Sequence, residues 1–203
     1  MPEPVMRPPL GLPAGSVRAI LALIIAGLFW TLLLIPDEKA IPIPLFLYFL
    51  SAMILLFFFA HGKSISSAED QSAPFGLPRG TFRVLILLGT VAVCGLHYYL
   101  YGRFPLQRLK PQPEQLNQWP LLLAWLVGGV ALGWLVGRGP WRRSYVFMDL
   151  QAWVALLAML GLGAEIVIVL FINPSLKTDL KLDLGTWECV LTGIVAFYFG
   201  SRS

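Results

Sequence analysis

The sequence predicts an all-α integral membrane protein, with six transmembrane helices in one domain of residues 1–203. Three observations support this fold class. Hydrophobic residues make up 57% of the chain and the mean hydropathy is +0.74, which leaves too little polar surface for a soluble globule. Six apolar runs approach the roughly 20 residues that cross a hydrocarbon core. Finally, a short motif opens two of these runs with nearly the same residues.

The predicted spans are joined by short connections, none of them large enough for a soluble domain. Helices are expected because each span must satisfy its own backbone hydrogen bonds, and no alternating pattern predicts a barrel. The six spans are residues 16–35, 41–60, 82–101, 119–137, 150–172 and 184–200.

The distribution of Lys and Arg predicts the orientation. With the amino terminus inside, nine of the fifteen basic residues lie on the inner face and six on the outer face. Because basic residues resist translocation, both termini are expected in the cytoplasm.

The repeated motif divides the chain into helical hairpins. Residues 11–23, GLPAGSVRAILAL, recur as residues 76–88, GLPRGTFRVLILL. The second, fourth and sixth spans each end with an aromatic or aliphatic stretch that is followed by a small residue and then a basic residue. Two hairpins are clear, residues 11–64 and 76–139. A third, residues 145–203, lacks the opening motif, so it is either a degenerate copy or a chance match.

The opening motif also predicts an anion site. Ser16 and Thr81 each follow a glycine and are expected to be helix N-caps. Arg18 and Arg83 come two residues later, where the helix dipole disfavours a cation. An anion is therefore expected beside them, either a lipid phosphate or an acidic surface of a partner subunit. In the alternative, the arginines snorkel into the headgroup layer without a specific ligand.

These openings and the closing residues 197–202, FYFGSR, resemble motifs in uncharacterised bacterial multi-pass membrane proteins. In those proteins a Gly-Ser-Val-Arg-Ala start and a Phe-Tyr-Phe-Gly-Ser-Arg end bracket helical hairpins. The resemblance implies the hairpin boundaries and a bacterial inner membrane as the location, and it carries no known activity. This chain departs from the pattern at Phe82, where the family has Val, and at the end of the second span, where residues 60–62 replace Gly-Ser-Arg.

Glycines mark a packing face in the fourth span. Gly129, Gly133 and Gly137 recur every four residues and therefore share one side of a helix, which lets a neighbouring helix approach closely. That neighbour is either another span of the same chain, which is the favoured expectation, or a second subunit.

The ionisable residues within the spans are the strongest candidates for chemistry, because a charge in hydrocarbon is costly unless it is neutralised, paired or hydrated. His97, Glu165 and Glu188 lie at comparable depth toward the outer side. Clustered together, the carboxyls would share a proton or pair with His97, which would suit proton or cation passage. In the alternative, a protonated Glu165 hydrogen-bonds across helices and holds the bundle together. On the face of the fifth span that carries Glu165, Gln151 at the inner end is the only further polar residue.

The two cysteines offer weaker alternatives. Cys94 and Cys189 could form a disulfide, or could join His97 and Glu188 in a mixed metal site, and His97 could be an axial ligand of haem or chlorophyll. Two cysteines so far apart in sequence form no metal-ligand motif. No metal and no cofactor are therefore expected, apart from a structural phospholipid.

Two function classes remain. Enzyme motifs are absent from the sequence, and the net charge of +4 follows from topology rather than from nucleic-acid binding. We expect a structural or anchoring subunit of a larger bacterial membrane assembly, whose inner-face arginines contact lipid phosphate or a partner subunit; a homo-oligomer is also open. The alternative is a small proton or cation channel or transporter that uses Glu165, Glu188 and His97.

Overall fold

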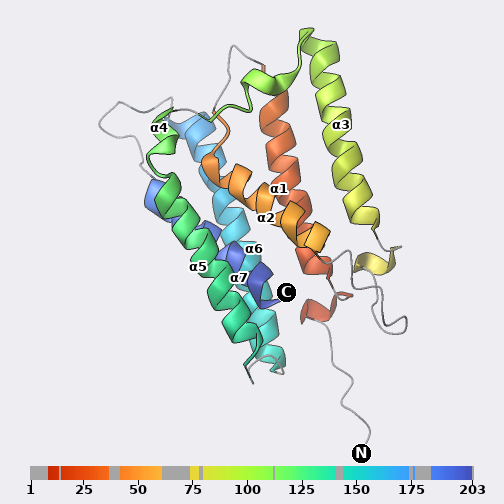
Figure 1. Ribbon diagram of the computed structural model, residues 1–203, viewed down its shortest axis with the longest axis vertical. Helices are drawn as coiled ribbons and strands as arrows, with labels where there is room; N and C mark the ends of the chain where they lie inside the picture. The colour runs from red at the N-terminus through yellow and green to blue at the C-terminus, as the bar shows by residue number, and fades with distance from the viewer. Residues whose placement is uncertain are drawn as a thin grey trace, which may run out of the picture.

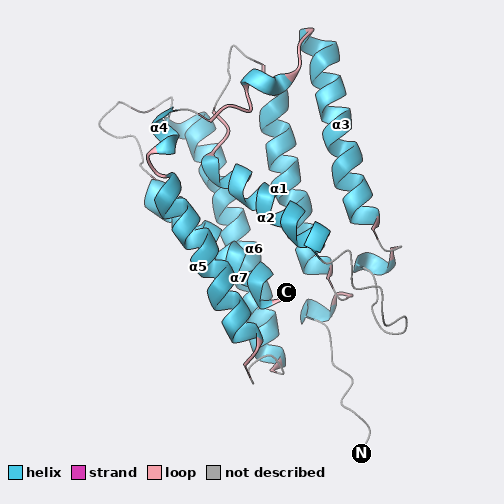
Figure 2. Ribbon diagram, in the orientation of Figure 1, coloured by secondary structure: helices cyan, strands magenta, loops and turns pink. Residues whose placement is uncertain are grey.

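The computed structural model describes residues 9–13, 15–36, 42–60, 74–77, 80–111, 113–139, 144–173, 176 and 184–202. Within these residues all regular structure is helical (Figure 2), which confirms the predicted all-α class. The α-helices are α1 (Ser16–Leu34), α2 (Leu45–Ala60), α3 (Thr81–Tyr101), α4 (Pro113–Leu116), α5 (Trp119–Gly137), α6 (Tyr145–Val167) and α7 (Gly185–Ser201).

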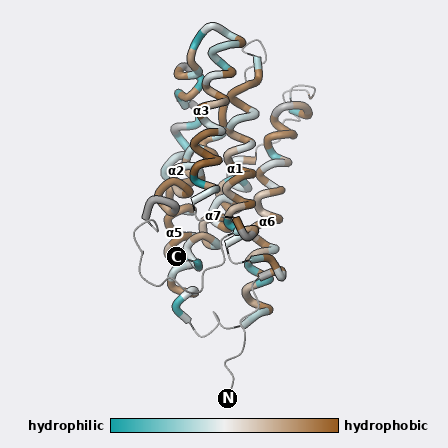
Figure 3. Tube along the Cα trace, turned by 90° about the vertical axis from the view of Figure 1, so that its right-hand side faces the viewer, coloured by the Kyte–Doolittle hydropathy of each residue, from teal (hydrophilic) through white to brown (hydrophobic). Residues whose placement is uncertain are grey.

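Four of these helices, α1, α3, α5 and α6, are long and apolar enough to cross a membrane. Apolar residues follow their traces along most of their length (Figure 3). With 16 and 17 residues, α2 and α7 are shorter than the roughly 20 residues that a straight crossing needs. These lengths are consistent with an integral membrane protein, while the count of six spans stays a prediction.

Two helix starts differ by several residues from their predictions. α2 begins at Leu45 rather than at residue 41, and α6 begins at Tyr145 rather than at residue 150. The extended start of α6 includes the charged residue Asp149. In the structure, Asp149 Oδ1 accepts a 2.7 Å hydrogen bond from the backbone N–H of Leu10. The carboxylate has a partner within the chain, so the helix continues past it.

The helices form a bundle around a core shared mainly by α1, α2, α6 and α7 (Figure 1). α5 covers one side of the bundle and makes its most extensive contact with α7. On the other side α3 stands apart and packs on α1 (Figure 1). The largest of the nearly fully buried core side chains include Leu21, Ile25, Phe46, Leu50, Met159, Leu162 and Phe199.

Neighbours in space follow the predicted hairpins only in part. α1 contacts α2, and α6 contacts α7, as hairpin partners should. In the second predicted hairpin, α3 packs on α1 while α5 packs on α7, so these two helices lie on opposite sides of the bundle (Figure 1). The connection between them crosses the upper end of the bundle and contains the 3-10 turn Pro105–Gln107 and α4.

The repeated opening folds twice into the same turn. The 3-10 turns Pro9–Gly11 and Pro74–Gly76 both have a non-glycine residue with positive φ at their centre, at 58° and 55°. A glycine with φ of 84° or 89° then precedes each helix. The structural repeat therefore begins at Pro9 and Pro74, two residues before the motif that starts at Gly11 and Gly76, and both copies have proline there.

Ser16 and Thr81 are not the N-caps that the sequence predicts. They are the first residues of α1 and α3, and Gly15 and Gly80 occupy the N-cap positions. Glycine is needed there because other residues adopt positive φ only with strain. The hydroxyl of Ser16 instead accepts a 3.2 Å hydrogen bond from the backbone N–H of Phe75.

Candidate functional site

Arg18 lies at the lower end of the bundle, between α1 and the C-terminal end of α7. Its Nη1 donates a 3.1 Å hydrogen bond to the backbone carbonyl of Arg202, and its guanidinium lies 4.9 Å from the ring centroid of Phe57. Carbonyl groups at a helix C-terminus carry partial negative charge and lack an intrahelical partner. The acceptor that Arg18 reaches in the described structure is therefore a helix end of the same chain.

The two repeated turns also dock at this end, and they do so in the same way. In each turn, the backbone N–H of the central residue is donated to a side chain on a neighbouring helix. Leu10 donates to Asp149 of α6, and Phe75 donates to Ser16 of α1. The first turn thus ties the start of α1 to α6, and the second ties the start of α3 to α1.

We expect Ser16→Ala to lower the free energy of unfolding by about 1 kcal/mol, because the N–H of Phe75 loses its acceptor. Ser16 is fully buried, so water cannot replace the hydroxyl. Thermal unfolding of the purified protein in detergent measures the effect. The matched control is Ser144→Ala, which removes an exposed hydroxyl that makes no capping hydrogen bond to α6. Equal losses in the two variants would contradict the docking role.

Arg83 occupies the position in α3 that Arg18 occupies in α1, but its surroundings differ. Its side chain is partly buried, and among the described residues no hydrogen bond or ion pair engages its guanidinium. Thr81 lines a groove between α3 and α1. One copy of the motif therefore faces the end of α7, whereas the other lies at the edge of the bundle.

Glu165 of α6 and Glu188 of α7 meet close to where α2 and α7 begin. Their side chains are within hydrogen-bonding reach of each other. Glu188 Oε1 also accepts a 3.3 Å hydrogen bond from the backbone N–H of Phe46, in the first turn of α2. The two carboxyl groups thereby connect α2, α6 and α7.

His97 lies elsewhere, in α3. Its Nδ1 is 2.9 Å from the backbone carbonyl oxygen of Arg103, and its ring lies 4.7 Å from that of Tyr101. Among the described residues, no group of three or more His, Cys, Asp and Glu side chains is placed to hold a metal ion. The structure thus brings Glu165 and Glu188 together, whereas His97 contacts residues at and just after the C-terminal end of its own helix, α3.

The disulfide considered for Cys94 and Cys189 does not form, since both cysteines are free. Cys94 lies in α3 and is partly buried, whereas Cys189 is buried in α7, directly after Glu188. α3 packs on α1 rather than on α7, which keeps the two helices apart.

The glycine face of α5 packs against α7 of the same chain. A Cβ added at Gly137 would lie 2.7 Å from the carbonyl oxygen of Ser201. At Gly129 and Gly133 an added Cβ would overlap the backbone carbonyls of Gly193 and Phe197. The helices touch backbone to backbone, which is the close approach that such small residues allow.

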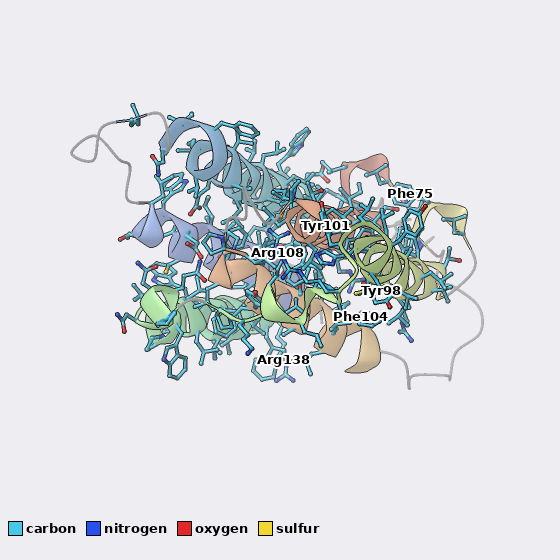
Figure 4. All side chains as sticks on the ribbon, turned by 90° about the horizontal axis from the view of Figure 1, so that it is seen from above. Phe75, Tyr98, Tyr101, Phe104, Arg108 and Arg138 are labelled. Carbon is cyan, nitrogen blue, oxygen red and sulfur yellow. The ribbon has the colours of Figure 1, made fainter. Side chains whose placement is uncertain are left out.

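Arg108 is an important residue that the sequence analysis missed. It follows α3 in the connection to α5, and its Nη1 donates hydrogen bonds to the backbone carbonyls of Leu33, at 2.9 Å, and Ile35. The Tyr101 hydroxyl donates a 3.1 Å bond to the carbonyl between them, that of Leu34. Figure 4 shows Arg108 and Tyr101 near each other in the view from above. The two side chains together bind the C-terminal end of α1.

Arg108 and Arg18 therefore have the same role at opposite ends of the bundle. Each donates to carbonyl groups where a helix ends, which in a water-poor environment lack another donor. Burial lowers the pKa of Arg108, Tyr101 opposes that shift and Arg103 adds to it. No sequence pattern marks Arg108, because the helix end it binds lies some seventy residues earlier in the chain.

These contacts form three polar clusters: one around Arg18 at the start of α1, one formed by Arg108 and Tyr101 at the end of α1, and one formed by Glu165 and Glu188. The groove beside α3 adds a fourth candidate surface, which is almost entirely apolar. Comparison of the chain with models of protein families, with curated proteins and with solved structures finds no match.

Proposed function

We propose that this chain is a structural subunit of a larger membrane protein assembly, and that it contacts a transmembrane helix of its partner through α3. The observation that carries the proposal is the exposure of α3. Over the apolar stretch of 18 residues in each candidate span, 6% of α3 is buried within the chain, against 17% of α5 and 44% of α1 and of α6. Helices in a bilayer associate through close packing rather than through a hydrophobic driving force. A spanning helix packed on a single neighbour has most of its surface available for another one.

The surface of α3 beside α1 forms a groove that suits a helix. It has a volume of about 710 Å³ and is lined by Trp30 of α1 and by residues of α3 from Gly80 to Ala92. At about 1.5 Å per residue this part of α3 is roughly 18 Å long. Trp30 forms its floor, because the indole ring packs against Gly89 and donates a 3.1 Å hydrogen bond to Thr90 Oγ1. An apolar groove with a fixed floor supports docking of an apolar helix.

The proposal divides the two repeated arginines between two roles. Arg18 acts within the fold, because it is bound to the end of α7. Arg83 is the inner-face arginine that we assign to lipid phosphate or to an acidic group of the partner. In the same proposal the end of the bundle that carries both arginines is the cytoplasmic one, and all six predicted helices cross the membrane.

A crosslinking experiment tests the role of α3. With a photocrosslinking amino acid at Leu88 in native membranes, we expect a crosslink to a second protein, because Leu88 lines the groove and is 63% exposed. The control is the same probe at Leu157, which is 59% exposed on α6 outside the groove. The native mass after gentle extraction identifies the complex. Crosslinks to lipid alone at Leu88, with the mass of a single chain, would contradict the proposal.

The alternative function, a small proton or cation channel or transporter, has less support. The contact between Glu165 and Glu188 is suited to hold a proton, but the face of α6 between Glu165 and Gln151 carries the buried apolar side chains Ala155, Ala158 and Leu162. A conducting path needs polar groups or water along its length. We therefore favour the subunit.

A further inference from the structure

We infer that Glu165 and Glu188 form a binding site for a single proton, which resides on Glu165 and is donated to the carboxylate of Glu188. The inference concerns the opposite side of the bundle from α3 and does not depend on the proposed partner. It rests on the surroundings of Glu165 Oε2, which receives no hydrogen bond from the described part of the chain, and of Glu188 Oε1, which accepts one.

One carboxyl oxygen of Glu165 lacks a hydrogen-bond donor. The side chain is only 7% exposed, and its Oε2 receives no hydrogen bond from the described part of the chain. A buried carboxylate oxygen without a donor is strongly unfavourable. The neighbouring group is the carboxyl of Glu188, which in its ionised form offers only acceptors. A proton between the two groups supplies the missing donor.

The positions of the helix N-termini determine which of the two glutamates is the anion. Glu188 lies in the first turn of α7, where the helix dipole favours negative charge. It also accepts the N–H of Phe46, which lies in the first turn of α2 and has no partner within that helix. Two helix N-termini thus stabilise the carboxylate of Glu188. No helix N-terminus stabilises a negative charge at Glu165, because it lies near the end of α6 and the helix continues beyond it as the π-helix Ile168–Ile172, so Glu165 carries the proton.

Few other titratable groups act on the site. From α7 the thiol of Cys189 lies next to the two carboxyls, while α2 contributes the Phe46 amide rather than a charge. Among the described residues, no Lys, Arg or His side chain forms a hydrogen bond or ion pair with either carboxyl. The pair therefore carries a net charge of −1 when it holds its proton and −2 when it does not, and repulsion in the second state favours rebinding.

The backbone beside Glu165 fits a site of this kind. From Ile168 to Ile172 the helix continues as a π-helix, and the N–H of Ile168 is shared between the carbonyls of Ala164 and Glu165. Single π-helical turns occur frequently at functional sites. Inward from the pair, the next polar side chain on the same face of α7 is Thr192, followed by the apolar Val195 and Phe199. The site is therefore placed to exchange its proton toward the nearer, outer end of the bundle.

Infrared spectroscopy of the full chain in lipid nanodiscs at pH 7 tests the inference. A glutamate in water is ionised at that pH, so the carbonyl stretching band of a protonated carboxyl reports a site that retains its proton. We expect this band in the wild type and its loss in Glu165→Gln. Glutamine keeps a donor for Glu188, so this variant should fold, as gel filtration would verify.

Two further variants make the assignment specific. Glu188→Gln should keep the band of Glu165 but shift it, because the acceptor changes from a carboxylate to an amide. Glu114→Gln replaces a glutamate of a different helix, α4, and should leave the band unchanged. A wild type without the band, or a band that persists in Glu165→Gln, would overturn the inference. Loss of the band only in Glu188→Gln would also overturn it, because the proton would then reside on Glu188 instead of Glu165. The crosslink at Leu88 should be the same in all four proteins, which separates this test from that of the partner.

Discussion

Gly133→Ala is expected to destabilise the protein by about 3 kcal/mol, at the upper end of the range for overpacked cores. A Cβ at this position would overlap the carbonyl of Phe197 and lie 2.8 Å from the backbone nitrogen of Ser201. Both obstacles are backbone atoms of α7, which cannot turn away as the end of a side chain can. α5 and α7 would have to separate along their whole contact, so the loss is a large fraction of a typical total stability of 5–15 kcal/mol.

The matched control is Gly128→Ala, one residue earlier in the same helix. A Cβ at Gly128 meets no atom within 4 Å, and replacing a glycine inside a helix by alanine commonly stabilises the helix by about 0.5–1 kcal/mol. The two substitutions make the same chemical change and should shift the melting temperature in opposite directions. Thermal unfolding in detergent measures both. A loss of stability in both variants, or in neither, would mean that α5 does not approach α7 as the structure has it.

This helix contact illustrates how far the sequence predicts the fold. Glycines at a spacing of four identify a close-packing face without any structure, because the period of a helix places them together. The partner of that face is not encoded in the same local way. α7 lies some sixty residues later in the chain, and short connections led us to expect α3 as the neighbour of α5. Contacts between distant helices depend on the shapes of both surfaces, which periodicity alone does not describe.

The candidate sites were predictable to different degrees. Glu165 and Glu188 could be identified from the sequence because charged residues are rare in apolar runs, and their depths suggested that they meet. His97 has similar depth but belongs to the helix that stands apart, which depth cannot reveal. Arg108 binds the end of α1 from a connection without regular structure, and its role depends on the path of that connection across the bundle. Depth along the membrane normal is thus readable from the sequence, whereas position around the bundle is not.

The repeated arginines provide the second large effect. We expect Arg18→Met to lower the free energy of unfolding by about 2 kcal/mol, in the range for a hydrogen bond that involves a charged group. The substitution removes the donor to the carbonyl of Arg202 and the cation over the ring of Phe57, while the methionine keeps most of the apolar stem. The C-terminal end of α7 then loses a positive charge that compensates the partial negative charge of the helix dipole.

Arg83→Met is the control that the repeat itself offers, because it makes the same change in the same motif. Its expected effect on stability is within about 0.5 kcal/mol, as for surface substitutions away from special features. Its effect should appear instead as a smaller yield of the Leu88 crosslink or as less co-purified lipid, since we assign Arg83 to an external anion. Similar destabilisation by both variants would contradict the division of roles. Because sequence alone gives the two arginines the same role, a difference between them would arise from their surroundings: α7 ends beside Arg18, whereas Arg83 begins a helix at the edge of the bundle.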